Sequence, residues 1–161
     1  MELDIVSVRL KKEGTLYDVL PKIETSEVAA AVFSDFLSGI DREVVALLTL
    51  NQRKKPINFS VISMGTLTES PVHPREVFKT AILSNAAGII IAHNHPSGDV
   101  EPSDKDMIIT ERLQEAGKLL GIELIDHIII GRSGEYYSFQ ENRMVLDSRG
   151  KQKMRVMENI K

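Results

Sequence analysis

The most constraining feature of the chain is a short apolar run that ends in two histidines and is followed by a turn and a helix. Residues 88–92 are continuously apolar, which is typical of a strand buried on both faces of a sheet. Residues 96–98, Pro-Ser-Gly, then favour a turn. Ser103 is suited to open a helix, and Gly121 is suited to end it. This order predicts a fold in which helices pack on a sheet.

His93 and His95 stand at the end of this predicted strand with one residue between them. Side chains two apart on a strand point to the same face, so both imidazoles can converge on one ion. Asp106 lies one turn into the predicted helix, where its carboxylate can reach back toward the strand end. A catalytic zinc takes three such ligands and keeps one position for water, although iron, manganese and cobalt accept similar groups. The pattern therefore predicts a metal site, with zinc preferred, made of His93, His95 and Asp106.

The rest of the chain predicts an α/β protein with a mixed β-sheet flanked by helices. Polar residues 51–56 separate two apolar runs and favour a hairpin, whereas other strands alternate with helical patterns. The further predicted elements are strand 4–10, helix 26–37, strands 43–50 and 57–64, a helix from Pro74 to about Ser84, and strands 122–130 and 135–139.

Length, charge and cysteine content narrow the class of protein. A chain of 161 residues is the size of one domain, and a net charge of −3 gives no basic field over the whole chain for nucleic acid. The lack of cysteine excludes disulfides and thiolate ligands. No secretory signal and no apolar run of about 18 residues are present. We therefore expect a cytoplasmic protein that crosses no membrane.

We expect one domain over residues 1–141 and an appended tail over residues 142–161. The tail is locally basic, and a loose, solvated end is the plain interpretation of such a segment. A contact with nucleic acid or with a protein partner is the alternative. The basic residues of the tail include Arg149, Lys151, Lys153 and Arg155.

A metal-bound water needs a base that takes its proton. Two carboxylates outside the predicted ligand set could serve. Glu43 precedes a strand-like run, and an ordinary charged residue at a strand edge is its plain alternative. Glu76 follows Pro74 in the first turn of a predicted helix, where the helix dipole favours a carboxylate in any case.

The other polar residues near this pattern have structural interpretations as well. Ser103 is suited to cap its helix, because Ser-x-x-Asp resembles a capping box. His127 lies in an apolar strand pattern, so we expect a core histidine or a partner of a metal ligand rather than a ligand. His73 is expected to cap the helix behind it or to line a cleft. Asp99 and Asp104 break the ligand spacing and are expected to be solvated.

The full string His-x-His-x7-Ser-x2-Asp, from His93 to Asp106, is the JAMM motif. The chain resembles the MPN/Jab metalloprotease family over about residues 40–140, and within it the RadC-like bacterial proteins. The resemblance implies the α/β architecture of that family, related to the cytidine-deaminase-like folds. Residues 1–39 lack the glycine-rich hairpins of a helix-hairpin-helix region, so the match is to the short, single-domain members. The segments that carry it are residues 65–67, 72–79, 93–98 and 120–131.

The resemblance also implies roles for two residues. Such proteins place the catalytic glutamate ahead of a Glu-x-x-x-Leu-Leu segment, which here begins at Glu43, and Ser103 would stabilise an oxyanion. The implied activity is that of a zinc-dependent hydrolase cutting a peptide or isopeptide bond in a protein substrate. A non-catalytic zinc-containing interaction module and a DNA-repair-associated accessory protein are the alternatives, and nucleic-acid binding stays open. A zinc deaminase would need cysteine ligands, which this chain lacks.

Overall fold

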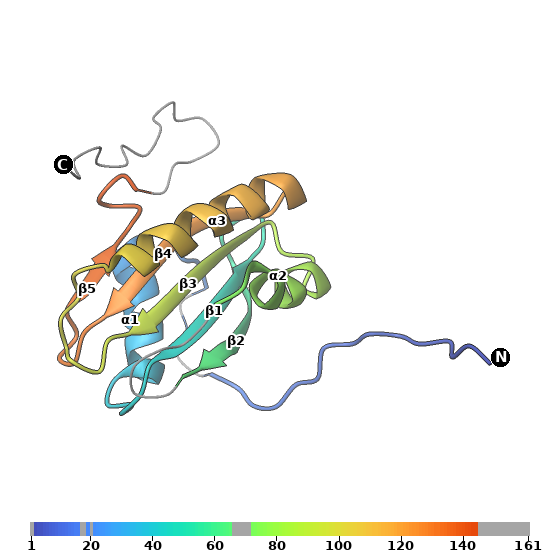
Figure 1. Ribbon diagram of the computed structural model, residues 1–161, viewed down its shortest axis with the longest axis horizontal. Helices are drawn as coiled ribbons and strands as arrows, with labels where there is room; N and C mark the ends of the chain where they lie inside the picture. The colour runs from blue at the N-terminus through green and yellow to red at the C-terminus, as the bar shows by residue number, and fades with distance from the viewer. Residues whose placement is uncertain (1, 17–18, 20, 66–71, 145–161) are drawn as a thin grey trace.

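The computed structural model describes residues 2–16, 19, 21–65 and 72–144. Its centre is a five-stranded sheet in the order β2-β1-β3-β4-β5 (Figure 1). Helix α1 covers one face of the sheet, and helices α2 and α3 cover the other. The elements are α1 (Ser26–Leu37), β1 (Val44–Leu50), β2 (Pro56–Met64), α2 (Pro74–Leu83), β3 (Gly88–Asn94), α3 (Asp104–Leu120), β4 (Glu123–Ile130) and β5 (Tyr136–Ser138).

The sheet is mixed, as the sequence predicts. Strand β3 pairs antiparallel with β1 on one side and parallel with β4 on the other, while the outer strands β2 and β5 pair antiparallel with their neighbours. The two central strands β1 and β3 are buried at every position. Because β1 and β3 are antiparallel, the start of β1 lies beside the end of β3. The predicted α/β class and mixed sheet are therefore confirmed.

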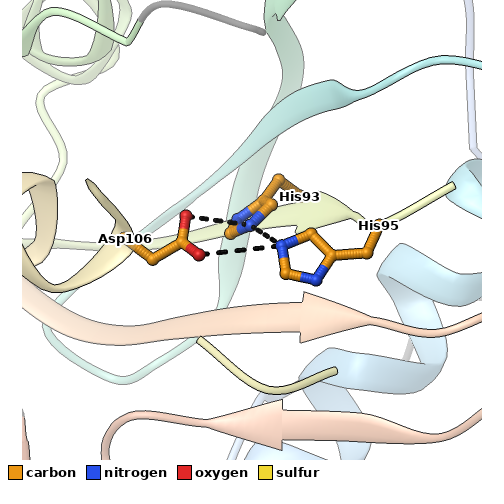
Figure 2. A group of neighbouring side chains, drawn as sticks. All are labelled: His93, His95 and Asp106. Carbon is orange, nitrogen blue, oxygen red and sulfur yellow. Dashed lines mark hydrogen bonds and ion pairs between the residues drawn. The ribbon is translucent and has the colours of Figure 1, made fainter. Parts of the chain in front are cut away.

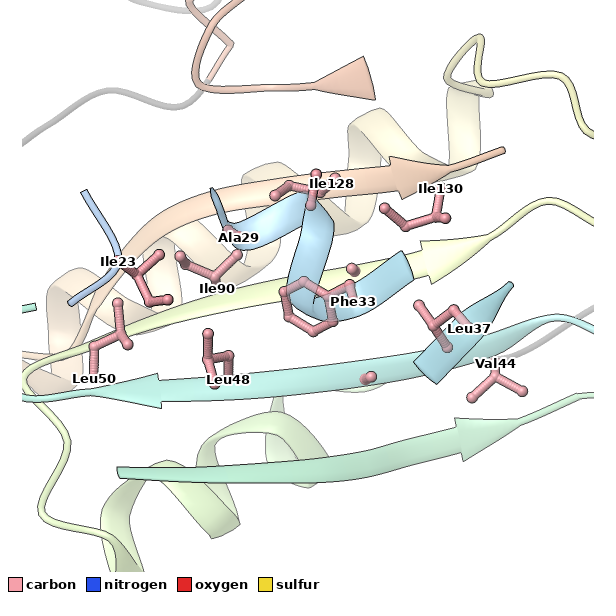
Figure 3. Close-up of a cluster of buried hydrophobic side chains, with 13 residues drawn as sticks. Ile23, Ala29, Phe33, Leu37, Val44, Leu48, Leu50, Ile90, Ile128 and Ile130 are labelled. Carbon is pink, nitrogen blue, oxygen red and sulfur yellow. The ribbon is translucent and has the colours of Figure 1, made fainter. Parts of the chain in front are cut away.

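Two apolar layers hold the helices on the sheet. Under α1, Phe33 and Leu37 are fully buried against alternate residues of β1, β3 and β4 (Figure 3). Thr25 caps α1 by accepting a hydrogen bond from the Val28 amide at 3.2 Å. On the opposite face, Phe78 of α2 and Leu113 of α3 belong to a second buried cluster. Successive strand residues serve opposite layers, as the period of a strand requires.

The buried face of helix α3 includes polar as well as apolar residues. Its buried residues Asp106, Thr110, Leu113 and Gly117 recur every three or four positions and so line one face. A Cβ on Gly117 would lie 2.4 Å from the carbonyl oxygen of Ile122, so glycine lets the helix approach the chain before β4. Gly121 then ends the helix in the left-handed conformation, with φ of 70°.

Three expectations differ from the structure or fall outside it. The predicted strand at residues 4–10 is wrong, because this segment is exposed and pairs with no strand of the described chain. An alternating pattern makes a strand only where a neighbour completes the hydrogen bonds. The spacing of Asp106, Ile109, Leu113 and Leu120 predicts that these residues share the inner face of α3, but Leu120 is 45% exposed. Residues 145–161, most of the predicted tail, lie outside the described residues.

Among the helices of the described residues, none combines the length and the apolar character needed to cross a bilayer.

Candidate metal centre

The end of β3 delivers two imidazoles to the start of α3. Strand β3 continues through His93 to Asn94, two residues beyond the predicted strand. His93 is almost fully buried, and His95 follows at the strand end with its amide bonded to the Ile130 carbonyl at 3.1 Å. Asp106, in the first turn of α3, faces both rings (Figure 2). The three predicted ligands are therefore neighbours.

The facing atoms are those that would bind a cation. His93 Nε2 lies 3.2 Å from Asp106 Oδ1, and His95 Nε2 lies 3.6 Å from Asp106 Oδ2 (Figure 2). The two Nε2 atoms are 3.0 Å apart. One ligand atom from each residue lies within 4.8 Å of the others, which makes these three the group in the described chain able to hold a metal ion.

Each histidine is also held from its second ring nitrogen. His95 Nδ1 donates to the carbonyl oxygen of Asp99 at 2.5 Å, and His93 Nδ1 lies 2.9 Å from His127 Nε2. A neutral imidazole whose Nδ1 carries the proton has its lone pair on Nε2, the atom that faces the cluster. Fixing the outer nitrogen is the usual way in which proteins orient a metal-binding histidine.

The electrostatics of the cluster favour a negative carboxylate beside imidazole nitrogens. Burial opposes ionisation of Asp106, but contacts with His93 and His95 outweigh it and hold the pKa of Asp106 well below its ordinary value. The same contact with Asp106 raises the pKa of His95. Burial lowers the pKa of His127 well below that of a free imidazole. The cluster thus presents an ionised carboxylate to a cation.

Ser103 is the N-cap of α3. Its hydroxyl accepts from the Asp106 amide at 3.2 Å, while Asp106 Oδ2 accepts from both the Ser103 amide (2.8 Å) and the Ser103 hydroxyl (2.7 Å). This is the capping box expected from the sequence, with aspartate in the usual glutamate position. The serine therefore also fixes the carboxylate that faces the histidines.

Glu43 lies beside the cluster, immediately before β1. Burial raises the pKa of its carboxyl, and the charges of His93 and Asp106 act on it as well, in opposite directions. Asn94 holds the backbone on both sides of Glu43: its Oδ1 accepts from the Val44 amide at 2.8 Å, and its Nδ2 donates to the Arg42 carbonyl at 2.9 Å. Asn94, the residue between the two histidines, thus fixes the backbone on both sides of Glu43.

Glu76 has a different environment. Its carboxylate is exposed and forms an ion pair with Lys79 at 2.6 Å, which lowers the pKa of Glu76. His73 caps the same helix by accepting from the Arg75 amide at 3.1 Å, one of the two roles expected of it. None of the interactions described for Glu76 connects it with the three facing residues.

The sequence interpretation missed three contributors to the cluster. They are Thr110, whose hydroxyl lies 2.6 Å from His127 Nδ1, the orientation of the His127 ring, which was expected only as a core histidine or a partner of a ligand, and the Asn94 contacts on both sides of Glu43. Asp99 is exposed as predicted, yet its backbone carbonyl orients His95. The spacing of four between Asp106 and Thr110 on one helix face was the available signal for Thr110.

Comparison with known proteins matches this domain to a described family. The family model of the RadC-like JAB domain matches residues 23–144. The chain is similar to a UPF0758 protein of Thermotoga maritima, with 43% identity over 76% of this chain and 54% of the relative. It is also similar to a UPF0758 protein of Clostridioides difficile, with 50% identity over 70% of this chain and 48% of the relative. A UPF0758 protein of Staphylococcus carnosus is 48% identical over 77% of this chain and 54% of the relative. The chain spans about half the length of these relatives.

Proposed function

Since the chain belongs to the RadC-like JAB domain family, we propose that it is a zinc-dependent hydrolase that cleaves a peptide or isopeptide bond of a protein substrate. The observation that carries the proposal is the convergence of His93 Nε2, His95 Nε2 and a carboxylate oxygen of Asp106 within 4.8 Å. This donor set fits zinc in type and number, with one coordination position left for water or substrate.

The three ligands would hold the ion at the junction of β3 and α3. When bound there, zinc would lower the pKa of a water ligand and polarise the substrate carbonyl. Both histidines are oriented by other groups, so they need no rearrangement of their outer hydrogen bonds to present Nε2. Both histidines could therefore bind zinc through Nε2 while keeping these contacts.

Glu43 is the proposed general base. Its carboxylate is half-buried beside the cluster, and the raised pKa that burial causes brings it nearer to neutrality, which suits a group that must take and return a proton. It would accept the proton of the attacking water at a carboxylate oxygen and donate it to the leaving amine. The exposed, lysine-paired Glu76 lacks these features.

Ser103 is the proposed donor to the developing oxyanion. Its hydroxyl donates at present to Asp106 Oδ2, so rotation about one side-chain bond would redirect this hydrogen toward a substrate oxygen. The backbone amide of Ser103 would still bind Asp106 Oδ2 after that rotation. Capping and oxyanion contact are therefore compatible in one residue.

The test is metal analysis of the purified chain followed by peptide cleavage. We expect one tightly held zinc per chain, and cleavage within a library of internally quenched peptides that disappears in the Glu43→Gln variant. Zinc retention with no cleavage by the wild type would favour the non-catalytic interaction module. A chain that binds no zinc would contradict the proposal altogether.

A further inference from the structure

Behind the cluster, a buried chain of hydrogen bonds runs from His93 to helix α3. His93 Nδ1 lies 2.9 Å from His127 Nε2, and His127 Nδ1 lies 2.6 Å from Thr110 Oγ1. The Thr110 hydroxyl in turn lies 2.6 Å from the backbone carbonyl oxygen of Asp106. This series of hydrogen bonds therefore begins at one proposed ligand, His93, and ends on the backbone of another, Asp106.

Thr110 decides the direction of every proton in this chain. A backbone carbonyl only accepts, so the single hydroxyl hydrogen of Thr110 is donated to the Asp106 oxygen. Toward His127 the hydroxyl must then accept, which places a hydrogen on His127 Nδ1 and leaves the lone pair of that ring on Nε2. His93 must donate to that lone pair from Nδ1.

These hydrogen-bond directions determine whether His93 Nε2, the atom that faces Asp106 and His95, carries a proton or a lone pair. With its proton held on Nδ1, a neutral His93 has its lone pair on Nε2, 3.2 Å from Asp106 Oδ1 and 3.0 Å from His95 Nε2. The opposite tautomer would point an N–H into the cluster and block a cation (Figure 2). A free neutral imidazole prefers its proton on Nε2, so the chain of hydrogen bonds overrides the intrinsic preference.

We propose that Thr110 and His127 are positioning residues that fix His93 as an Nε2 metal ligand, the hydroxyl of Thr110 setting the tautomer of both rings. This inference rests on the proposed metal site and adds what holds it ready. The surroundings suit the role: Thr110 and His127 are buried, and the His127 ring stacks on Phe139 with centroids 4.7 Å apart and planes 8° apart. The ring of His127 therefore has little freedom to turn.

Threonine offers a matched pair of variants. Thr110→Val keeps the branched shape but removes the hydroxyl, so His127 Nδ1 loses its acceptor and the ring is free to move its proton to Nε2. Thr110→Ser keeps the hydroxyl and restores the chain. Loss of such an outer partner typically costs about 10–100-fold in metal affinity. We expect Thr110→Val to bind zinc about 10–100-fold more weakly, and Thr110→Ser to bind close to the wild type.

The second readout is the tautomer itself in the zinc-free wild type. Long-range proton–nitrogen spectra of the imidazoles distinguish a protonated from an unprotonated ring nitrogen, and the chain has four histidines to assign. We expect His93 and His127 both to carry the proton on Nδ1. A protonated Nε2 on neutral His93 would overturn the inference, as would unchanged zinc affinity in a folded Thr110→Val variant.

The two proposals fail in different ways. A wild type without zinc affinity whose His93 and His127 both show Nδ1 protonation would refute the metal site and leave the tautomer assignment standing. A wild type that binds zinc with His93 protonated on Nε2 in the zinc-free state would refute the role of Thr110 alone. Should Thr110→Val fail to fold, the wild-type spectrum still decides.

Discussion

Two neighbouring residues of β4, Asp126 and His127, begin two different buried polar networks on opposite faces of the sheet. Asp126 faces α1, where its carboxylate accepts from the hydroxyls of Ser26 and Ser138, both at 2.7 Å, and from the Gln140 amide at 2.9 Å. Burial raises the pKa of Asp126 in spite of these donors. This network joins α1, β4 and β5, and its donors end on one acceptor.

The network that begins at His127 differs in its balance of hydrogen-bond donors and acceptors. It leads through His93 to a point where two imidazole nitrogens and a carboxylate face one another, which are acceptors in their neutral and ionised forms. Imidazole nitrogens and a carboxylate brought together in this way could hold a cation between them. A polar network whose donors end on one acceptor holds elements together, whereas one that gathers two imidazole nitrogens and a carboxylate at one point is suited to bind a cation.

Removing a proposed ligand should separate the two networks most sharply. His95→Ala deletes one facing nitrogen, and we expect it to lose more zinc affinity than the 10–100-fold typical of outer partners. Its far-ultraviolet circular dichroism should match that of the wild type, because both apolar layers are intact. Metal analysis after dialysis measures the loss. Full zinc occupancy in this variant would remove His95 from the ligand set.

Glu43→Gln addresses the proton transfer without touching a ligand. General acid–base help is worth roughly 10²–10⁴-fold in rate, so we expect a loss of that size in peptide cleavage with zinc affinity retained. Glu76→Gln is the matched control, because Glu76 is exposed and paired with Lys79, and its rate should stay near that of the wild type. Equal losses in both variants would contradict the assignment of the base.

The facing residues could be predicted because each depends on short-range geometry. The strand period places His93 and His95 on one face, and the helix start places Asp106 within reach of them. The mixed sheet followed from apolar runs separated by a hairpin and by helices. These inferences need only the period of an element and the residues that bound it.

The supporting contacts could not be predicted because they depend on register between distant segments. His127 reaches His93 only through the parallel pairing of β3 with β4, which shifts between Ile89 and Ile90. Asn94 clamps a segment about 50 residues earlier in the chain. The strand expected at residues 4–10 failed for the same reason, since a pattern does not supply a partner strand.

The closed network should respond in stability rather than in metal binding. Asp126→Ala removes the acceptor shared by the Ser26 hydroxyl, the Ser138 hydroxyl and the Gln140 amide, and a buried polar group left unsatisfied costs roughly 1–3 kcal/mol. We expect a lower free energy of unfolding in urea and zinc affinity close to that of the wild type. A large loss of zinc affinity at unchanged stability would show that the two networks are coupled through β4.

The smallest structural effect should come from removing zinc itself. Small zinc domains unfold without metal because they have little other core. Here Leu47, Ile91 and Ile129 on one face of the sheet, and Phe33 on the other, are buried by apolar contacts that need no ion. Chelation should therefore leave the far-ultraviolet circular dichroism nearly unchanged. It should lower the melting temperature only to the extent that the folded state loses the free energy of zinc binding.

The Asp126→Ala variant sharpens this expectation. It should melt at a lower temperature than the wild type both with and without zinc, since its lost contacts are independent of the ion. Unfolding of the zinc-free wild type at room temperature would show instead that the gathered lone pairs, and not the apolar layers, govern the stability of the domain.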